Sequence, residues 1–379
     1  MTNTALLRQD LARELAARGR LTDPAWRAAV EAVPRELFLG DAVFRPHGTR
    51  WEPVRREQLD DDEWLRMVHS DTTWVTQVDG IGAREATAPV AGRPTSSGTL
   101  PSLVARMLEL ADVRDGHRVL EIGTGTGYST AVLCHRLGDE HVYSAEYDET
   151  VAAAAAQHLR AAGCSPHLVV GDGLRGHQDG ADYDTVIATC AVRTVPPSWL
   201  WQLRDGGGIT TTISGWMLGS GLIRLVLDEE GVAHGRFAAD PVSYMLARPH
   251  ERPPRSTFYA HPGSTRETRL SPDLLDDWTG LFVAQLGAPS AELVRLAEGV
   301  ALVDAATGSQ AWTEPDGAGG GWRVHQDGPL HLWDQVEDAL DAWQKAGSPD
   351  QTAFGMTVTE WDQVVWLGDP EGPCWRLPT

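Results

Sequence analysis

Apolar side chains recur at helical spacing near the start of the chain. Leu7, Leu11 and Leu15 follow one another every four residues, a pattern typical of an amphipathic helix. Asp23-Pro24 then supplies two residue types that favour the start of a second helix, an N-cap and a first-turn proline. We therefore expect two helices between residues 5 and 40.

Between residues 44 and 101 the apolar pattern is irregular, and apart from a short strand at 74–78 this stretch is expected to form a lid or lining. From residue 117 onward, short apolar runs alternate with helical runs, which predicts βαβ units and a mainly parallel sheet. A hairpin over 222–237 would close that sheet with antiparallel strands. The expected strands before this hairpin lie near residues 118–122, 141–145, 167–170, 185–189 and 209–214.

Residues 248–255 have the composition of a linker, because consecutive prolines stiffen the chain and cannot join a strand ladder. We therefore expect a first domain over 1–247 and a C-terminal α+β domain over 248–379. Eight of the 15 tryptophans lie after residue 270, where most would form core or, alternatively, line a peptide groove. The expected elements of the second domain are helices at 272–286 and 332–345, a hairpin at 300–313, and strands near 354 and 364.

The 379 residues include 32 basic and 53 acidic ones, a net charge of −21. This charge gives little support for binding phosphate backbones or anionic lipid, so we expect neither nucleic acid nor membrane as a partner. The four cysteines form no C-x-x-C pair, and the 13 histidines form no H-x-x-x-H or H-E-x-x-H arrangement. We therefore expect no disulfide framework, no metal site and a protein of the reducing cytoplasm.

A glycine loop between an expected strand and an expected helix is the main chemical signal. The strand is Val119-Leu120-Glu121-Ile122, and three glycines alternate with threonines directly after it. Missing side chains let the backbone approach a ligand, and the amides of the following helix face its anionic end. The G-x-G-x-G spacing differs from the dinucleotide pattern, and no G-K-[ST] follows, which excludes a nucleotide triphosphate loop. The expected cofactor-binding residues here are Glu121, Gly123, Thr124, Gly125, Thr126 and Gly127.

Acidic residues follow the next two strands. Glu146 comes 19 positions after Gly127, where a carboxylate can accept hydrogen bonds from both ribose hydroxyls, unless it is only a solvated strand-end acid. Asp172 lies between two glycines at the end of the third strand and would receive an adenine amino group, although a plain turn would explain it alone. Together with the loop, these residues favour a methyltransferase that binds S-adenosylmethionine. Further expected contacts are Tyr147, Gly173 and Leu174.

Between about residues 25 and 220 the chain resembles the protein L-isoaspartate O-methyltransferase family. The resemblance implies a seven-stranded, Rossmann-like α/β sheet and an S-adenosylmethionine-dependent carboxyl O-methyltransferase acting on a peptide or protein. The segments that carry it are Val33-Pro34-Arg35-Glu36-Leu37-Phe38, 101–110, 119–132, Gly171-Asp172-Gly173 and Tyr183-Asp184-Thr185-Val186-Ile187.

Members of that family hold the substrate carboxylate near a Ser-x-Pro motif, to which Thr99-Leu100-Pro101 corresponds here, with the hydroxyl kept. Pro101 suits the first turn of a helix, whose free amides would orient a carboxylate together with that hydroxyl, unless Thr99 only caps the helix. An Asp carboxylate with a pKa of about 3.9 is ionised at neutral pH, so no strong general base is required. The expected catalytic residues are Thr99, Ser97 and Pro101.

The C-terminal extension, with 75–80 and 94–97, is more similar to variant methyltransferases that accompany modified ribosomal peptides such as lanthipeptides and graspetides. This resemblance implies an L-Asp of a precursor peptide as acceptor, with an ester that closes to aspartimide and opens to isoaspartate. By the same resemblance, repair enzymes lack so large an addition. The C-terminal domain would recognise the peptide or serve only in oligomerisation or core covering. Two other functions stay open: repair of isoaspartyl proteins, and noncatalytic escort of a peptide.

Overall fold

The computed structural model describes residues 3–254, 258–261, 263–317 and 321–378. The chain divides into a first unit, Met1–Thr189 with Trp201–Thr210, and a second unit, Cys190–Leu200 with Thr211–Thr379. This division differs from the expected boundary at residue 247, because strands β9 (Tyr183–Val192) and β10 (Leu203–Ser214) each contribute residues to both units. No helix within the described ranges is long and apolar enough to cross a membrane.

The two expected amino-terminal helices are confirmed. Asp23 caps the second, its side chain accepting a hydrogen bond from the backbone N of Ala25 at 2.7 Å. The Arg136 guanidinium bonds to Asp23 at 2.9 Å and lies 4.2 Å from the ring centre of the buried Trp26, which fixes this helix against α5. The helices concerned are α1 (Thr4–Ala17), α2 (Pro24–Ala32) and α5 (Tyr128–Leu137).

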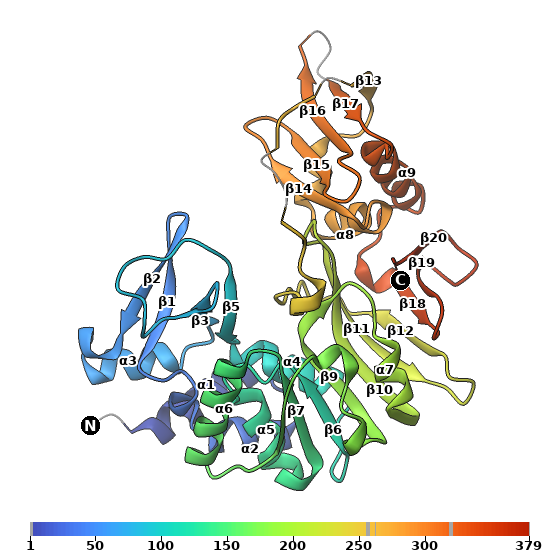
Figure 1. Ribbon diagram of the computed structural model, residues 1–379. Coiled ribbons are helices and arrows are strands. Elements are labelled where there is room, and N and C mark those ends of the chain that lie inside the picture. The colour runs from blue at the N-terminus through green and yellow to red at the C-terminus, as the bar shows by residue number, and fades with distance from the viewer. Residues whose placement is uncertain (1–2, 255–257, 262, 318–320, 379) are drawn as a thin grey trace. The chain divides into compact units, whose positions relative to one another are not determined.

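The stretch expected to be irregular forms a five-stranded antiparallel sheet, in which β3 is the expected strand at 74–78. Phe44, Val75 and Val78 pack into one buried cluster, while Val43 and Trp64 belong to another. Both clusters are apolar, so this small sheet has a core of its own. Figure 1 shows its strands and α3. Its elements are β1 (Ala42–His47), β2 (Arg50–Arg55), α3 (Asp61–Val68), β3 (Trp74–Val78), β4 (Ile81–Gly82) and β5 (Pro94–Gly98).

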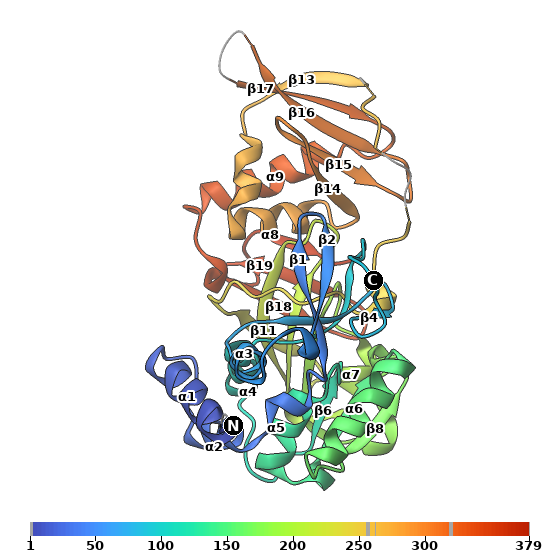
Figure 2. The same ribbon diagram turned by 90° about the vertical axis from the view of Figure 1, so that its left-hand side faces the viewer.

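The expected parallel strands are confirmed in the first unit. β6 pairs in parallel with β7 and β9, and β7 pairs in parallel with β8, so that the neighbours run β8-β7-β6-β9-β10. Helices α5 and α6 flank these strands (Figures 1 and 2). The elements are α4 (Pro101–Leu110), β6 (Val119–Ile122), β7 (Val142–Glu146), α6 (Glu149–Ala161) and β8 (His167–Val170).

The second unit continues the sheet as β10-β11-β12-β18-β19-β20, after the short helix α7 (Pro197–Trp201). The expected hairpin is confirmed, since β11 and β12 pair antiparallel. The expected seven strands are corrected to ten, because β18 pairs with the outer edge of β12 and carries β19 and β20 with it. These strands are β11 (Ser220–Leu227), β12 (Ala233–Phe237), β18 (Phe354–Val358), β19 (Gln363–Leu367) and β20 (Cys374–Arg376).

A second antiparallel sheet in the same unit has the order β13-β17-β16-β15-β14 and confirms the hairpin expected at 300–313. Helices α8 and α9 lie on one face of it, where Trp333, Val336 and Leu340 of α9 are buried (Figure 2). The elements are β13 (Ser264–Thr268), α8 (Trp278–Gly287), β14 (Ala291–Arg295), β15 (Val300–Asp304), β16 (Gln310–Asp316), β17 (Gly321–Asp327) and α9 (Leu332–Lys345).

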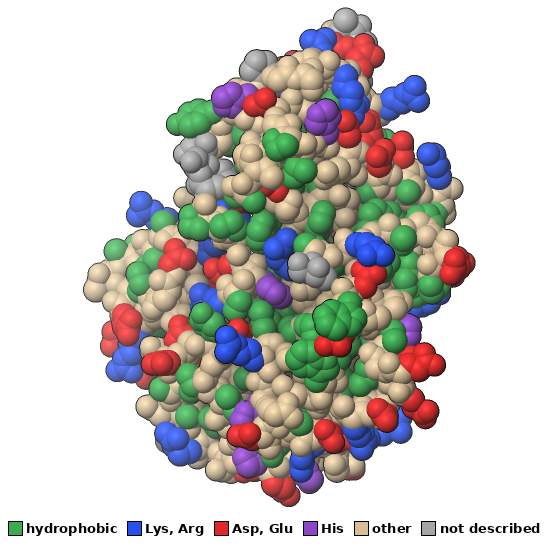
Figure 3. All heavy atoms as spheres, turned by 45° about the vertical axis from the view of Figure 1, so that its right-hand side comes forward, with side chains coloured by type: hydrophobic (Ala, Val, Ile, Leu, Met, Phe, Trp, Pro, Cys, Tyr) green, Lys and Arg blue, Asp and Glu red, His purple; other side chains and the backbone are tan. Residues whose placement is uncertain are grey.

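The expected linker holds a short 3-10 helix at Arg248–His250, and residue 255 lies outside the described residues. Of the eight late tryptophans, Trp333, Trp343 and Trp366 are buried, whereas Trp361 is 80% exposed and the other four are half-buried. The expectation that most of them form core is therefore met only in part. Charged side chains of both signs are scattered over the face shown in Figure 3.

Arg35 is the most buried arginine of the first unit, with 1% of its surface exposed. Its guanidinium donates hydrogen bonds to the backbone carbonyls of Val68, Ser70, Thr72 and Thr99, and burial lowers its pKa to about 10. It therefore joins the turn after α3 to the segment before α4.

We predict that Arg35→Met lowers the free energy of unfolding by about 3 kcal/mol, because buried carbonyls lose their donors. Arg35→Lys should fall between this variant and the wild type, since lysine has fewer donors. Arg13→Met, at an exposed arginine paired with Asp10, should change stability by less than about 0.5 kcal/mol. Urea unfolding followed by circular dichroism measures all three, and equal losses for Arg35→Met and Arg13→Met would contradict the assignment.

Candidate active site

The glycine loop lies between the end of β6 and the start of α5, as expected. Gly123, Gly125 and Gly127 have φ values of 97°, 54° and 93°, a left-handed region that other residues rarely adopt. A Cβ on Gly123 would lie 2.8 Å from the hydroxyl of Thr189, which itself donates to the Gly123 carbonyl at 2.6 Å. Both conformation and space therefore require glycine at the first position.

Glu121 of β6 is fully buried and acts as an acceptor within the protein. Its carboxylate accepts hydrogen bonds from Ser129 and Thr130 at 2.5 Å and from Ser144 at 2.7 Å. Because the single hydroxyl proton of Ser144 is used in this bond, Thr124 of the loop donates to Ser144, at 2.7 Å. Burial raises the pKa of Glu121, and the hydroxyl donors oppose that rise. The geometry thus gives Glu121 partners that position the loop.

Glu146 at the end of β7 reaches the same loop. One carboxylate oxygen accepts a hydrogen bond from the backbone N of Gly125 at 2.9 Å, and the other accepts from the backbone N of Asp148 at 3.0 Å. The side chain is half-buried, and an ionised carboxylate has about four acceptor positions. Glu146 can therefore hold the loop and still accept further hydrogen bonds. The neighbouring Tyr147 is 53% exposed.

Asp172 begins a single 3-10 turn, Gly173–Arg175, and accepts a hydrogen bond from the backbone N of Leu174 at 3.0 Å. A Cβ on Gly173 would come within 2.6 Å of Ile122, the last residue of β6. Glycine at that position lets the turn pack against the strand that leads into the loop. The turn geometry is compatible with a ligand, because within the described part of the chain the contact of the second carboxylate oxygen of Asp172 is a distant one, 3.9 Å from Arg175.

The segment 97–101 lies beside the glycine loop in the first unit. Ser97 pairs with Val75 across β5 and β3, and its carbonyl oxygen would be 3.7 Å from a Cβ on Gly125. Pro101 is the first residue of α4, as expected. Thr99 is half-buried between β5 and α4, and its carbonyl accepts from Arg35 at 3.3 Å. The two hydroxyl residues and the loop are therefore neighbours.

The alternative that Thr99 only caps α4 and the expectation that the amides there are free are both corrected. Thr99 is not the N-cap of α4, because the cap residue is Leu100 and no side chain bonds there in the capping position. The amides are not all free either: Asp71 accepts from the backbone N of Ser102 at 2.9 Å, and Thr73 accepts from that of Leu100 at 3.1 Å. Sequence reasoning missed Asp71, because nothing local marks a residue 31 positions from its partner.

Cys134, Asp139 and Cys164 form a group that no spaced sequence motif marks. Their ligand atoms lie within 4.8 Å of one another. Burial raises the pKa of both thiols, which favours the protonated forms over the thiolates that bind metals. Asp139 already accepts a hydrogen bond from the backbone N of Ser165 at 2.6 Å. This chemistry gives a metal ion little support here.

We predict that the stability difference between wild type and Glu121→Gln depends on pH. The raised pKa means that the folded state binds the Glu121 proton more tightly than the unfolded state. The wild type should therefore be favoured most at low pH. Its advantage should shrink as pH rises above about 4.5, the ordinary value, and level off above the folded pKa.

Thermal unfolding of both proteins between about pH 4 and pH 8 measures this difference. Glutamine keeps the size of the side chain, and the surrounding hydroxyls can rotate to accept from its amide. Glu140→Gln removes an exposed carboxylate and controls for the change in net charge. A difference between wild type and Glu121→Gln that stays constant over this range would count against the burial argument.

Comparison with known proteins shows which family the chain resembles. The sequence model of the family described as protein-L-isoaspartate(D-aspartate) O-methyltransferase matches residues 59–216. A protein-L-isoaspartate O-methyltransferase from Ignicoccus hospitalis is 33% identical over 202 residues, which cover 53% of this chain and 78% of that relative. One from Opitutus terrae is 33% identical over 215 residues, covering 56% of this chain and 75% of the relative.

Among solved structures, a chain named protein-L-isoaspartate O-methyltransferase matches with a TM-score of 0.54 and 20% identity, a likeness of fold. It covers 93% of this chain and 96% of that one, so most of the C-terminal region is included. That chain therefore has a fold that extends over most of this one. From the identity and coverage of its relatives, the chain belongs to the protein-L-isoaspartate O-methyltransferase family of S-adenosylmethionine-dependent enzymes.

Proposed function

We propose that the protein transfers a methyl group from S-adenosylmethionine to a carboxylate oxygen of an isoaspartyl residue in a peptide or protein. The observation that carries this proposal is the placement of the glycine loop: Glu146 holds it at Gly125, and Ser97 of β5 lies beside the same glycine. A cofactor loop and two hydroxyl side chains, those of Ser97 and Thr99, therefore lie together in one unit.

The loop fits the cofactor on steric grounds, because a Cβ on Gly125 would meet only the Ser97 carbonyl, at 3.7 Å. We assign the loop 123–127, with Thr124 and Thr126, to the methionine end of the cofactor. Glu146 and Tyr147 are assigned to the ribose. Asp172, with Gly173 and Leu174, is assigned to the adenine. Glu121 is assigned a positioning role, since its carboxylate is enclosed by protein hydroxyls.

Bound S-adenosylmethionine supplies an electrophilic methyl group on its sulfonium sulfur. The protein's own task is to bring an acceptor carboxylate to that methyl group and to keep water away, which supplies most of the rate increase in such a transfer. Ser97 and Thr99 would orient the acceptor through their hydroxyls. Asp71 holds the start of α4 in place. It also uses the backbone N–H of Ser102, which is then not available to the acceptor carboxylate.

A second candidate acceptor is an ordinary L-Asp of a modified ribosomal precursor peptide. The residues at 75–80 and 94–97, which resemble those of such variant enzymes, favour it. Residues 75–78 lie in β3 and 94–97 in β5. In this case the backbone N of the following residue attacks the methyl ester and expels methanol. The resulting aspartimide either persists or takes up water to give isoaspartate. The C-terminal region would then recognise the precursor.

We predict that Gly125→Val weakens the binding of S-adenosylhomocysteine by at least about tenfold, because the new side chain occupies the space over the loop. Gly308→Val is the matched control: its φ of 74° imposes similar strain, and nothing lies within 4 Å of its Cβ position. Isothermal titration calorimetry compares the two variants. Equal affinity of Gly125→Val and wild type would show that the loop is not the cofactor site.

We also predict that an isoaspartyl peptide gains the mass of one methyl group when incubated with the enzyme and S-adenosylmethionine. A peptide with L-Asp at the same position is compared with it. The Gly125→Val variant, which should not bind the cofactor, is the negative control. Mass spectrometry separates the outcomes. Methylation or net loss of water on the L-Asp peptide alone would favour the precursor-peptide candidate. No mass change on either peptide would support a noncatalytic escort and contradict the proposed activity.

A further inference from the structure

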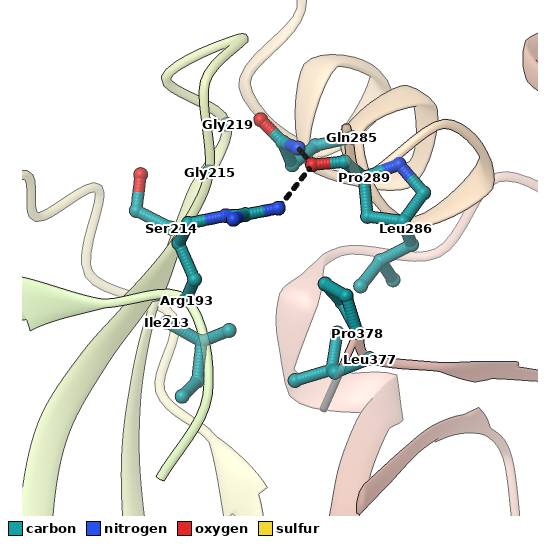
Figure 4. Close-up of a pocket in the computed structure, with 10 residues that line it drawn as sticks. All are labelled: Arg193, Ile213, Ser214, Gly215, Gly219, Gln285, Leu286, Pro289, Leu377 and Pro378. Atoms are coloured by element: carbon teal, nitrogen blue, oxygen red, sulfur yellow. Dashed lines mark hydrogen bonds between the residues drawn. The ribbon is translucent and has the colours of Figure 1, made fainter. Parts of the chain in front are cut away.

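A shallow pocket in the second unit contains an arginine whose charge is not balanced by a carboxylate. Arg193 is the residue that follows β9, and its guanidinium points towards α8 and Pro289 (Figure 4). One terminal nitrogen donates to the Pro289 carbonyl at 3.0 Å. The apolar wall of the pocket consists of Ile213, Leu286, Leu377 and Pro378. The pocket thus combines one cation with an apolar wall.

The Arg193 guanidinium is half-buried, and burial is the single cause that lowers its pKa. Within the described residues it has no ion pair. Two other arginines differ: Arg136 pairs with Asp23, and Arg252 of the same unit pairs with Glu292 at 2.8 Å. Burying a cation without an anionic partner costs free energy. A guanidinium has five N–H donors, and the Pro289 carbonyl accepts from one of those of Arg193.

The guanidinium is also held in a fixed position before any ligand arrives. It lies 3.8 Å from the ring centre of Trp216. The backbone N of Arg193 donates to His250 Nδ1 at 3.0 Å, and the indole N–H of Trp216 donates to the His250 carbonyl at 3.0 Å. The backbone of Arg193 and the ring of Trp216 are therefore both bonded to His250. Such preorganisation lowers the entropy lost when an anion binds.

We propose that the Arg193 pocket binds a carboxylate of the peptide substrate other than the one that is methylated. Two sources fit this chemistry: an acidic side chain near the acceptor residue, and the C-terminal carboxylate of a short peptide. The proposal rests on the proposed function, because it assumes a peptide substrate. A protein with a net charge of −21 repels acidic peptides, so a local cation would be needed to hold one.

The residue type of Arg193 fits a carboxylate ligand. Arginine suits the task better than lysine, because its planar fork can bond both oxygens of a carboxylate.

The test uses isoaspartyl peptides in matched pairs: one pair exchanges Glu for Gln beside the acceptor, and the other exchanges a free C-terminus for an amide. Calorimetry in the presence of S-adenosylhomocysteine gives their affinities, and methyl transfer gives KM and kcat. The wild type should prefer the carboxylate member of one pair by about tenfold. Arg193→Gln should lose that preference through KM, with kcat unchanged, and Arg193→Lys should keep part of it.

Arg236→Gln is the matched control. Arg236 also lies over an indole, 4.7 Å from the Trp366 ring centre, and donates to carbonyls, but it is exposed. This variant should keep the full preference. Thermal unfolding shows whether Arg193→Gln is folded, and Arg193→Lys serves if it is not.

Equal wild-type affinity for both members of each pair, or no peptide binding at all, would overturn the proposal. A preference that survives in Arg193→Gln would do the same. If only the proposed function fails, the result differs from these outcomes. The preference for the carboxylate peptide would still be measured by calorimetry, which needs no turnover, although no peptide is methylated.

Discussion

The buried carboxylate of Glu121 is the constraint on which the site depends. It joins β6, which carries it, to Ser144 on β7 and to Ser129 and Thr130 in the first turn of α5. Three neutral hydroxyl donors, rather than a cation, bond to it. These hydrogen bonds compensate part of the cost of burial without a salt bridge. Glu121 connects the strand before the glycine loop to the helix after it. One set of hydrogen bonds therefore fixes the two ends of the loop.

The parts of the fold that sequence could predict are those whose signal is local. Strands β6 and β7 are short apolar runs followed by helices, a pattern that parallel sheets impose because both faces are covered. Strands β1 and β2 gave no such signal, since residues such as Arg45, Pro46 and Glu52 interrupt the apolar pattern. These two strands form because they pair with each other. β18 could be seen as a strand but not placed, because its partner β12 lies more than a hundred residues earlier.

The same distinction applies to the candidate site. Glycines at alternating positions after a strand, and acids after the next two strands, are local patterns, and the structure brings Gly125 and Glu146 into contact. The surroundings of Thr99 are not local: Arg35, 64 residues away, holds its carbonyl, and Asp71 takes an amide of the neighbouring helix. Residue types alone predicted free backbone amides at the start of α4. In the structure the Asp71 carboxylate already accepts a hydrogen bond from one of them.

Arg35 and Arg193 show how a structural arginine differs from a binding one. Arg35 is almost fully enclosed, yet four backbone carbonyls accept hydrogen bonds from its terminal nitrogens, which offsets part of the cost of burying its charge. Arg193 is less buried but has one carbonyl partner and an indole face, and no carboxylate among the described residues. Folding alone accounts for the first, because its terminal nitrogens hold four backbone carbonyls in place. It does not account for the second, since a neutral side chain would stack on Trp216 at lower desolvation cost. An anionic ligand supplies the missing partner.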